Sequence, residues 1–437
     1  MSSEWVERSL GDLITIKHGF AFPGDHISKN KGKCVLVTPG NFEIGGGFKE
    51  GNTKYFHGEY PEEYVFTEGD LIVTMTDLSK TADTLGYSAK IPALEGKTYL
   101  HNQRVGRIYA ESPEAELTYL YWVMRHRDYR SWVVNTATGS TVKHTSPSRI
   151  LEYSFQLPPP PEQKAIAHIL GTLDDKIELN RKTNETLEAM AKALFKSWFV
   201  DCDPVRAKAE GRPTGLPDQI SDLFPDSFED SELGEIPSGW GVKALDDVAH
   251  FLNGLALQKF PPQEGDPTLP VIKIAQLKKG DTLGADRCST AVPDEYVIRA
   301  GDVLFSWSGS LAVDIWCGGQ GALNQHLFKV TSKTHQKWFI YQWIKHHLPE
   351  FQEIAQGKAT TMGHIQRQHL SEAKALDPTT SLLTAMDSTF TPLLDRAFGL
   401  RRQSRELSLI RDALLPKLIS GEIRIPDAER MLEEVGV

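Results

Sequence analysis

Hydrophobic residues recur at alternating spacings of four and three positions over two long stretches of the chain, 166–198 and 386–418. Each position of the second stretch lies 220 residues beyond its counterpart in the first. This heptad spacing predicts two long helices with matching apolar seams, which we expect to pair as an antiparallel coiled coil. The predicted seam of the helix pair comprises Ile166, Leu170, Leu173, Ile177, Asn180, Asn184, Leu187, Leu194, Trp198, Met386, Phe390, Leu393, Leu400, Leu407, Leu414 and Leu418.

A helix over residues 162–199 would be about 57 Å long, and a pair of such helices would hold other parts of the chain at a fixed distance. Polar seam residues such as Asn180, Asn184 and Ser404 typically set the register and orientation of paired helices. The alternative is that both stretches form ordinary core helices inside one globule.

Outside these stretches the pattern is mixed. Apolar and polar residues alternate at 35–42, 71–76, 271–277 and 303–308, which predicts short strands. One helix is expected at 118–133 and another at 338–354, and each is followed by a loop rich in Gly, Ser and Thr, at 136–144 and 355–364. The fold class predicted is therefore α+β.

The chain also repeats itself, and four pairs of segments match in the same order. Residues 62–76 resemble 294–308 at an offset of 232, and residues 100–108 resemble 322–330 at 222. Residues 141–144 resemble 361–364 at 220, and residues 5–22 resemble 240–257 at 235. We infer that one α+β unit and its helix have been duplicated, with a few residues lost from loops of the second copy.

These patterns divide the chain into a first domain at 1–157, a helix at 158–200, an acidic linker rich in Pro and Gly at 201–239, a second domain at 240–378, a second helix at 379–420 and a tail at 421–437. The net charge is −10, and most of it lies in 201–240, which carries three Lys and Arg against ten Asp and Glu. We expect this segment to be a solvated connector. The two domains are close to neutral.

Composition narrows the protein class further. The cysteines Cys34, Cys202, Cys288 and Cys317 lie far apart without a C-x-x-C pair, so free thiols in a reducing compartment are expected. No apolar run is long enough to span a membrane, and no signal peptide is recognised. We expect a cytoplasmic protein that does not bind membranes.

Four segments together resemble the specificity subunits of type I restriction-modification systems. The most specific are LPPPPEQKAIAHILGTLDDKIELNRK at 157–182 and LEAMAKALFKSWFVDCDPVRAKAEG at 187–211. ELGEIPSGWGVKALDDVA at 232–249 and IRDALLPKLISGEI at 410–423 also fit. In that family two target-recognition domains alternate with two conserved helices, and the resemblance covers nearly the whole chain.

The resemblance implies a non-catalytic subunit that binds double-stranded DNA. Each recognition domain would read one half of a split, asymmetric site. Two modification subunits would methylate adenine with S-adenosylmethionine, and ATP-dependent restriction subunits with Mg would cleave DNA, so this chain would hold no cofactor itself. Three alternatives stay open: a single-chain enzyme with unrecognised motifs, a coiled-coil scaffold, and an orphan specificity subunit.

Candidate DNA contacts are polar side chains that can reach groove edges from loops. Those in the first domain are Gln103, Arg104, Ser140, Thr141, Lys143 and His144. Those in the second are Ser306, Trp307, Ser308, Lys358, Thr360, Thr361, His364 and Arg367. The Asn-Gln pair common to both domains, at 102–103 and 324–325, is expected to brace each fold, because the two domains should read different sequences.

No catalytic or metal motif is recognised. The nearest phosphate-loop candidate, Glu95-Gly96-Lys97-Thr98, has Ile91 where the first glycine should stand. His346 and His347 are adjacent and would point in different directions on a helix, which disfavours a shared metal ion. The absence of such motifs fits the binding subunit with catalytic partners that the resemblance implies.

Overall fold

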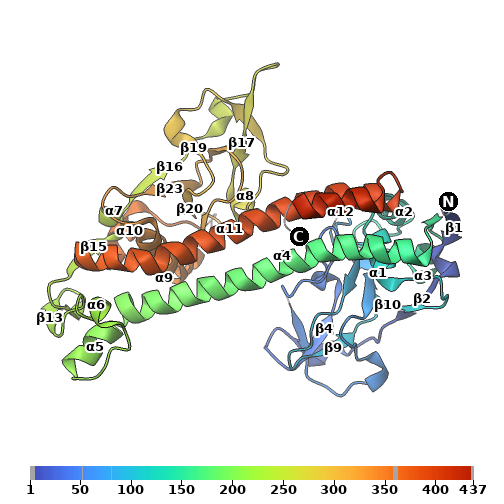
Figure 1. Ribbon diagram of the computed structural model, residues 1–437, viewed down its shortest axis with the longest axis horizontal. Helices are drawn as coiled ribbons and strands as arrows, with labels where there is room; N and C mark the ends of the chain where they lie inside the picture. Colours follow the sequence, from blue (N-terminus) through green and yellow to red (C-terminus); the bar gives the residue numbers. More distant parts are fainter. Residues whose placement is uncertain (1–4, 52, 80, 358–362, 435–437) are drawn as a thin grey trace. The chain divides into compact units, whose positions relative to one another are not determined.

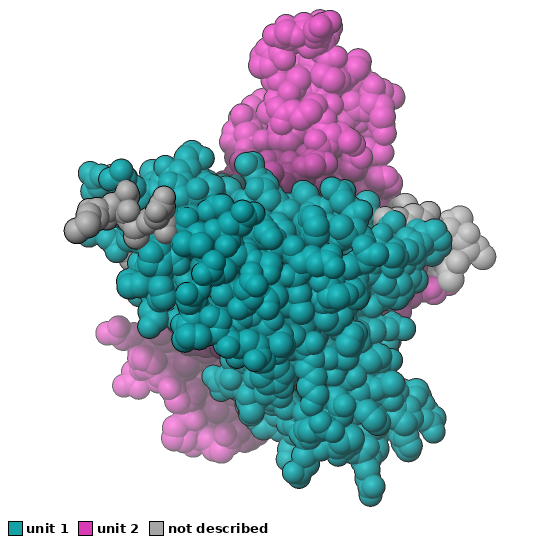
Figure 2. Space-filling model, turned by 90° about the vertical axis from the view of Figure 1, so that its right-hand side faces the viewer, with its two compact units in different colours: residues 1–176, 407–437 teal, residues 177–406 magenta. Residues whose placement is uncertain are grey.

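The computed structural model describes residues 5–51, 53–79, 81–357 and 363–434, which form two compact units (Figures 1 and 2). Unit 1 comprises Met1–Lys176 and Leu407–Val437, and unit 2 comprises Ile177–Glu406. Each unit therefore contains one part of each long helix. Among the described residues, no helix combines the length and hydrophobicity that a membrane crossing requires.

Unit 1 is built on two four-stranded sheets. The first is antiparallel throughout and has the order β2 (Ile14–His18), β10 (Val105–Ala110), β6 (Leu71–Thr74), β8 (Ser88–Lys90). The second has the order β3 (Ile27–Ser28), β5 (Lys54–Phe56), β4 (Cys34–Val37), β9 (Thr98–His101), in which β4 and β9 run parallel. Buried residues from both sheets, including Val37, Ile72 and Tyr99, form one hydrophobic cluster.

Unit 2 repeats this arrangement. Its antiparallel sheet has the order β16 (His250–Asn253), β23 (Leu327–Thr331), β20 (Val303–Ser306), β21 (Ala312–Ile315). Its second sheet has the order β18 (Arg287–Ser289), β17 (Thr268–Ile272), β22 (Gly321–Leu323), β19 (Val297–Ile298), with β17 and β22 parallel. In each unit the first and last strands also pair: β1 (Val6–Ser9) with β12 (Ser154–Leu157), and β15 (Gly241–Ala244) with β24 (Lys374–Asp377). The predicted α+β duplication is confirmed.

The two long helices are α4 (Pro160–Phe195) and α11 (Thr380–Ile419), of 36 and 40 residues. In unit 2 the amide of Asn180 donates to Gln403 Oε1 at 2.9 Å, while Phe195 packs against Phe390. Since Phe195 follows Asn180 and Phe390 precedes Gln403, the helices run antiparallel there. Every predicted seam residue, in either unit, is buried or half-buried.

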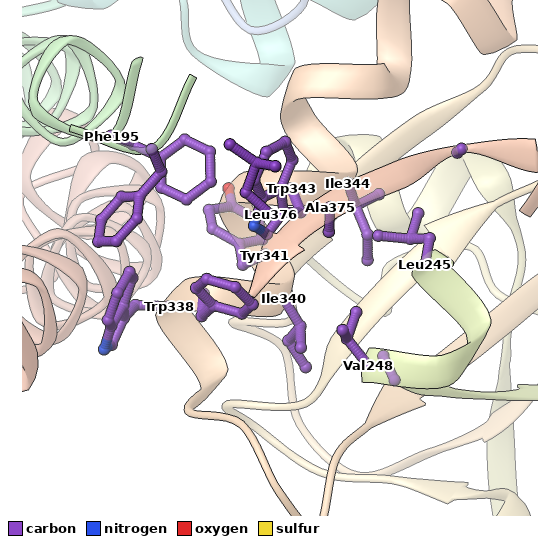
Figure 3. Close-up of a cluster of buried hydrophobic side chains, with 14 of the residues drawn as sticks. Phe195, Leu245, Val248, Trp338, Ile340, Tyr341, Trp343, Ile344, Ala375 and Leu376 are labelled. Atoms are coloured by element: carbon purple, nitrogen blue, oxygen red, sulfur yellow. The ribbon is translucent and has the colours of Figure 1, made fainter. Parts of the chain in front are cut away.

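Helix α11 is part of the hydrophobic core of unit 2. Phe390 stacks on Trp338 of α9 (Lys337–Gly357) at 4.4 Å, and Phe195 of α4 contacts Trp343 of the same helix at 5.1 Å. Figure 3 shows Phe195 pointing toward this aromatic group, with Leu245 and Val248 of α7 (Leu245–Val248) on its other side. The helix pair and the domain thus share one core within unit 2.

Residues 201–239 are not the solvated connector that their charge predicts. They form α5 (Asp203–Ala209), α6 (Asp218–Ser221) and a hairpin of β13 (Phe228–Ser231) and β14 (Gly234–Pro237). Val205, Phe224 and Ile236 are at most 5% exposed and join the core of unit 2. The prediction was wrong because the acidic residues lie between widely spaced apolar anchors that no short periodicity reveals.

Three predicted elements end early or are divided. The strand at 271–277 stops at Ile272, because the Lys273 N–H donates to Gln276 Oε1 and begins α8 (Ile274–Lys279). The strand at 35–42 stops at Val37, before a 3-10 turn that starts with Pro39. The helix at 118–133 is two helices, α1 (Leu117–Val123) and α2 (Arg127–Asn135).

His101 on β9 gives unit 1 a pH-dependent stability. It is 1% exposed, its Nε2 lies 2.8 Å from the Val105 carbonyl, and burial lowers its pKa to about 4. Because this pKa lies below the unfolded value of about 6.5, the stabilisation is complete above that pH and is lost as pH falls toward 4. The expected slope is at most about 1.4 kcal/mol per pH unit.

His101→Leu is expected to reduce this acid sensitivity, because the counterpart in unit 2 is the buried Leu323. Urea unfolding of the variant and wild type at pH 7.5, 6 and 5 measures the change. Part of the slope should remain, since burial also lowers the pKa of His126 in the same unit. His168→Leu, at an exposed site on α4, is the control; equal pH slopes in His101→Leu and wild type would contradict the account.

Candidate DNA interface

In unit 1 the structure brings three separate candidate segments together at the end of β6. The Met75 N–H donates to the Arg104 carbonyl at 3.0 Å, and the Thr145 N–H donates to the Met75 carbonyl at 3.0 Å. The next residues form β7 (Thr76–Asp77), which pairs with β11 (Lys143–His144) of the Gly-Ser-Thr loop. We name this region the candidate surface of unit 1; its predicted contact residues are Gln103, Arg104, Ser140, Thr141, Lys143 and His144.

Unit 2 forms the equivalent region with the same backbone bonds. The Trp307 N–H donates to the His326 carbonyl at 3.4 Å, and the Ile365 N–H donates to the Trp307 carbonyl at 3.0 Å. Ser308 bridges to His364 as Thr76 pairs with His144. The candidate surface of unit 2 contains Trp307, Ser308, His326, His364 and Arg367. The predicted contacts Lys358, Thr360 and Thr361 lie outside the described residues.

The asparagines shared by the two units brace the turn between the paired strands. Asn102 is 6% exposed and its Oδ1 accepts the Arg104 N–H at 3.1 Å. Asn324 is 3% exposed and its Oδ1 accepts the His326 N–H at 3.3 Å. The next residues are exposed Gln103 and Arg104 in unit 1 and half-buried Gln325 and His326 in unit 2, so the two turns differ in residue type only at Arg104 and His326.

Ser306 was predicted to contact DNA, but the structure places its side chain inside unit 2. It is 0% exposed, and its hydroxyl donates to the carbonyls of Ser308 and Ser310, both at 3.2 Å. Its counterpart Thr74 is also 0% exposed and donates to the Thr76 carbonyl at 3.0 Å. Because both hydroxyls close the same backbone turn, this position supports the strand end and is turned away from the surface.

The two surfaces differ in the side chains that this frame carries. In unit 1 the Thr76 hydroxyl lies 3.2 Å from Nδ1 of His144, on the Gly-Ser-Thr loop. In unit 2 the Ser308 hydroxyl, which is buried, lies 2.8 Å from Nδ1 of His326, on the strand turn. Each hydroxyl thus orients an imidazole, but the imidazole comes from a different segment.

Trp307 replaces Met75 and is half-buried at the surface of unit 2. Its Nε1 donates to Asn253 Oδ1 at 3.0 Å and to the Gln325 carbonyl at 3.2 Å, and its ring lies 6.0 Å from that of His326. Arg367 is held nearby, because its Nη2 donates to the Phe251 carbonyl at 3.1 Å. The indole and the guanidinium are therefore positioned by the fold before any ligand binds.

A glycine at the same place in each unit allows the strand turn to pack. A Cβ on Gly19 would lie 2.3 Å from the Asn102 carbonyl oxygen, and one on Gly254 would lie 2.1 Å from that of Asn324. Backbone atoms cannot move aside as a flexible side chain can, so any larger residue must push the turn away.

Gly254→Ala is therefore expected to destabilise unit 2 by about 2–3 kcal/mol, the upper part of the range for an overpacked site. Thermal unfolding measures the effect. Gly319→Ala provides the control in the same unit, because a Cβ there meets nothing within 4 Å. Equal melting temperatures for the two variants would contradict the proposed close approach.

Asp77 was missed by sequence reasoning and organises the loop beside the candidate surface of unit 1. It is 4% exposed and accepts hydrogen bonds from the N–H groups of Ser79 and Thr84 and from the Thr84 hydroxyl. Burial alone would raise the pKa of this carboxyl, but these hydrogen bonds outweigh it and lower the pKa. The signal in the sequence is the acidic residue two positions before a serine, which is typical of a side-chain-capped turn.

The motifs tested for catalysis have structural roles. Gly96 lies in the turn before β9, and Lys97 bonds Glu50 at 3.1 Å. His347 Nε2 lies 2.9 Å from the Lys374 carbonyl. Across the described ranges, no group of three or more His, Cys, Asp or Glu residues is arranged to hold a metal ion, and all four cysteines are free thiols.

The family model and the similar proteins of known family agree with one another. A family model described as the type I restriction modification DNA specificity domain matches residues 2–189 and 237–374. The chain is 26% identical over 324 residues to the type I restriction enzyme MjaIX specificity subunit of Methanocaldococcus jannaschii, covering 71% of this chain and 69% of that protein. It is 26% identical over 345 residues to the HindI specificity subunit of Haemophilus influenzae, covering 68% and 74%.

The fold is similar as well. The S subunit of a type I restriction-modification system from M. genitalium aligns over 96% of each chain with a TM-score of 0.54 at 16% identity. The family model covers more than half of the chain and matches both of the repeated units. This protein therefore belongs to the family of type I restriction-modification DNA specificity subunits.

Proposed function

We propose that this chain is the DNA-reading subunit of a type I restriction-modification complex and that each unit reads one half of a bipartite, asymmetric target. The observation that carries the proposal is the pair of candidate surfaces. Both are built on the same backbone hydrogen bonds, yet Met75 and Arg104 in unit 1 correspond to Trp307 and His326 in unit 2. A common frame with different side chains suits two readers of different sequences.

In this proposal the contacts to bases and phosphates come from the exposed and half-buried polar residues of the two surfaces. In unit 1 these are Gln103, Arg104, Ser140, Thr141, Lys143 and His144. In unit 2 they are Trp307, His326, His364 and Arg367, together with Lys358, Thr360 and Thr361 from the predicted loop. Ser308 acts by orienting the His326 ring.

The chain itself carries out no chemistry in this proposal. Relatives such as the MjaIX protein are named specificity subunits of type I restriction enzymes. Two modification subunits would methylate adenine with S-adenosylmethionine, and restriction subunits would use ATP and Mg to cleave. Because both recognition domains are nearly neutral, the partners would supply much of the positive charge that the duplex requires. The complex would act in the cytoplasm.

In this proposal the helix pair sets the distance between the two half-sites of the DNA target. The segments are those derived above: recognition domains at 1–157 and 240–378, helices at 158–200 and 379–420, and a segment at 201–239 between the first helix and the second domain. One extra heptad lengthens a helix by about 10 Å, which corresponds to about three base pairs of B-DNA.

Inserting one heptad into both helices, at the level of Asn180 and Gln403, is expected to lengthen the unread spacer by about three base pairs while both half-sites stay the same. Genome-wide mapping of methylated adenines in cells that carry the variant and its modification subunit measures this. A heptad inserted into α4 alone is the control and should abolish methylation. An unchanged spacer with both insertions would exclude the helix pair as the ruler.

A further inference from the structure

The loop between β6 and β8 of unit 1 has no equal in unit 2. In unit 1 Val73 pairs with Ser88, and in unit 2 their counterparts Phe305 and Val313 pair with each other. The two paired residues are separated by seven more residues of sequence in unit 1, so its loop is seven residues longer. The additional residues follow β7 directly, and β7 pairs with the Gly-Ser-Thr loop of the candidate surface. The insertion therefore places extra chain next to the residues proposed to contact DNA.

This loop is anchored by contacts at both ends. Asp77 accepts the N–H groups of Ser79 and Thr84 at its start. The Arg130 guanidinium donates to the carbonyls of Ala82 and Leu85, which are at most 1% exposed. Residues 77–79 and 82–85 are thus held by buried groups and charge-assisted hydrogen bonds.

Leu78 is the first residue after this paired strand, and it is 67% exposed. A leucine left in water forgoes the favourable free energy of burial, although isolated exposed leucines do occur on protein surfaces. Here the exposed side chain belongs to an anchored insertion and directly follows Asp77, which pairs with Lys143 of the Gly-Ser-Thr loop. The shorter connection of unit 2 contains Ser310, whose hydroxyl accepts a hydrogen bond from Lys278, so this connection presents polar groups.

We propose that Leu78 is a specificity-determining residue of unit 1 that contacts the C5 methyl group of a thymine in the half-site read by that unit. An aliphatic side chain has no hydrogen-bonding atom, so the only base-specific feature it reads in the major groove is the thymine methyl group. This inference rests on the proposed function, and it adds a base contact that polar candidates cannot make.

Deoxyuridine substitution tests the contact, because deoxyuridine differs from thymidine only by the absence of this methyl group. The chain, assembled with its modification subunits, is titrated with duplexes in which each thymine of both half-sites is replaced in turn. Since an adenine is methylated in each half, each half contains at least one thymine. Loss of one buried methyl contact is expected to weaken binding about three- to fivefold at one thymine.

Leu78→Ser should bind the unmodified duplex as weakly as wild type binds the deoxyuridine duplex, and it should no longer respond to that substitution. Ile44→Ser is the matched control, because Ile44 is 70% exposed in the same unit but lies in the turn at 43–47, outside the candidate surface. This variant should respond as wild type does.

Two outcomes overturn the inference while leaving the proposed function intact: wild type binds a split site but responds to no deoxyuridine, or Leu78→Ser responds as strongly as wild type. A complex that binds no split site contradicts the proposed function itself.

Discussion

Phe390→Ala is expected to lower the free energy of unfolding of unit 2 by about 3–5 kcal/mol, the range for truncating a buried aromatic side chain. Phe390 is 0% exposed, stacks on Trp338 at 4.4 Å and meets the edge of Trp198 at 5.7 Å. Its removal would leave a cavity between α9, α11 and the helical segment Lys196–Val200 that follows α4, since Trp338 and Trp198 come from these different elements. Urea unfolding followed by tryptophan fluorescence measures the loss.

The control for this variant is Leu409→Ala on the same helix. Leu409 is 52% exposed, so its truncation should change the stability by no more than about 0.5 kcal/mol. If Phe390→Ala were as stable as this control, α11 would not belong to the core of unit 2.

Asp174→Asn is expected to destabilise unit 1 by about 2–4 kcal/mol. Asp174 on α4 accepts a hydrogen bond from Arg125 at 2.9 Å and another from Arg411 of α11 at 2.6 Å. The side chains of Arg125 and Arg411 are 5% and 17% exposed. Losing the carboxylate would leave the desolvated Arg125 without its acidic partner, whereas Arg411 would keep only Asp412 at 2.7 Å. Asp174 is itself 26% exposed, which places the expected loss below that of a fully buried pair.

Thermal and urea unfolding of Asp174→Asn and of Asp175→Asn, its exposed neighbour, provide the comparison. The control should lie within about 0.5 kcal/mol of wild type. A double-mutant cycle with Arg411→Met isolates the pair, because the loss from Asp174→Asn should shrink when one cation is absent. Additive losses would show that Asp174 and Arg411 do not interact.

Sequence reasoning predicted the long helices well because a seam of fixed spacing depends only on local geometry. The limits of α4 and α11 lie within a few residues of the predicted ones. The break between α1 and α2 was not predictable, since it depends on long-range contacts. Arg125, at the break, donates to the Gly45 carbonyl and to Asp174, which are distant in sequence.

Only part of the candidate DNA interface could be predicted from the sequence. Comparing the repeats identified the segments that meet at the ends of β6 and β20, since each repeat keeps them in the same order. The sequence does not show which side chains are buried, so Ser306 was predicted to contact DNA although it is 0% exposed. Leu78 was not predicted because a single apolar residue has no periodicity. The sequence offset between matching segments of the two repeats becomes smaller across this loop, and that decrease was the signal of an insertion in the first repeat.

The central claim, that this chain directs methylation to a split target, is tested most directly in living cells. A modification subunit is expressed with and without the chain, and methylated adenines are mapped across the genome. The account predicts a split motif with a methylated adenine in each half, present only when the chain is present. Methylation that persists without the chain, or that never appears with it, would contradict the account.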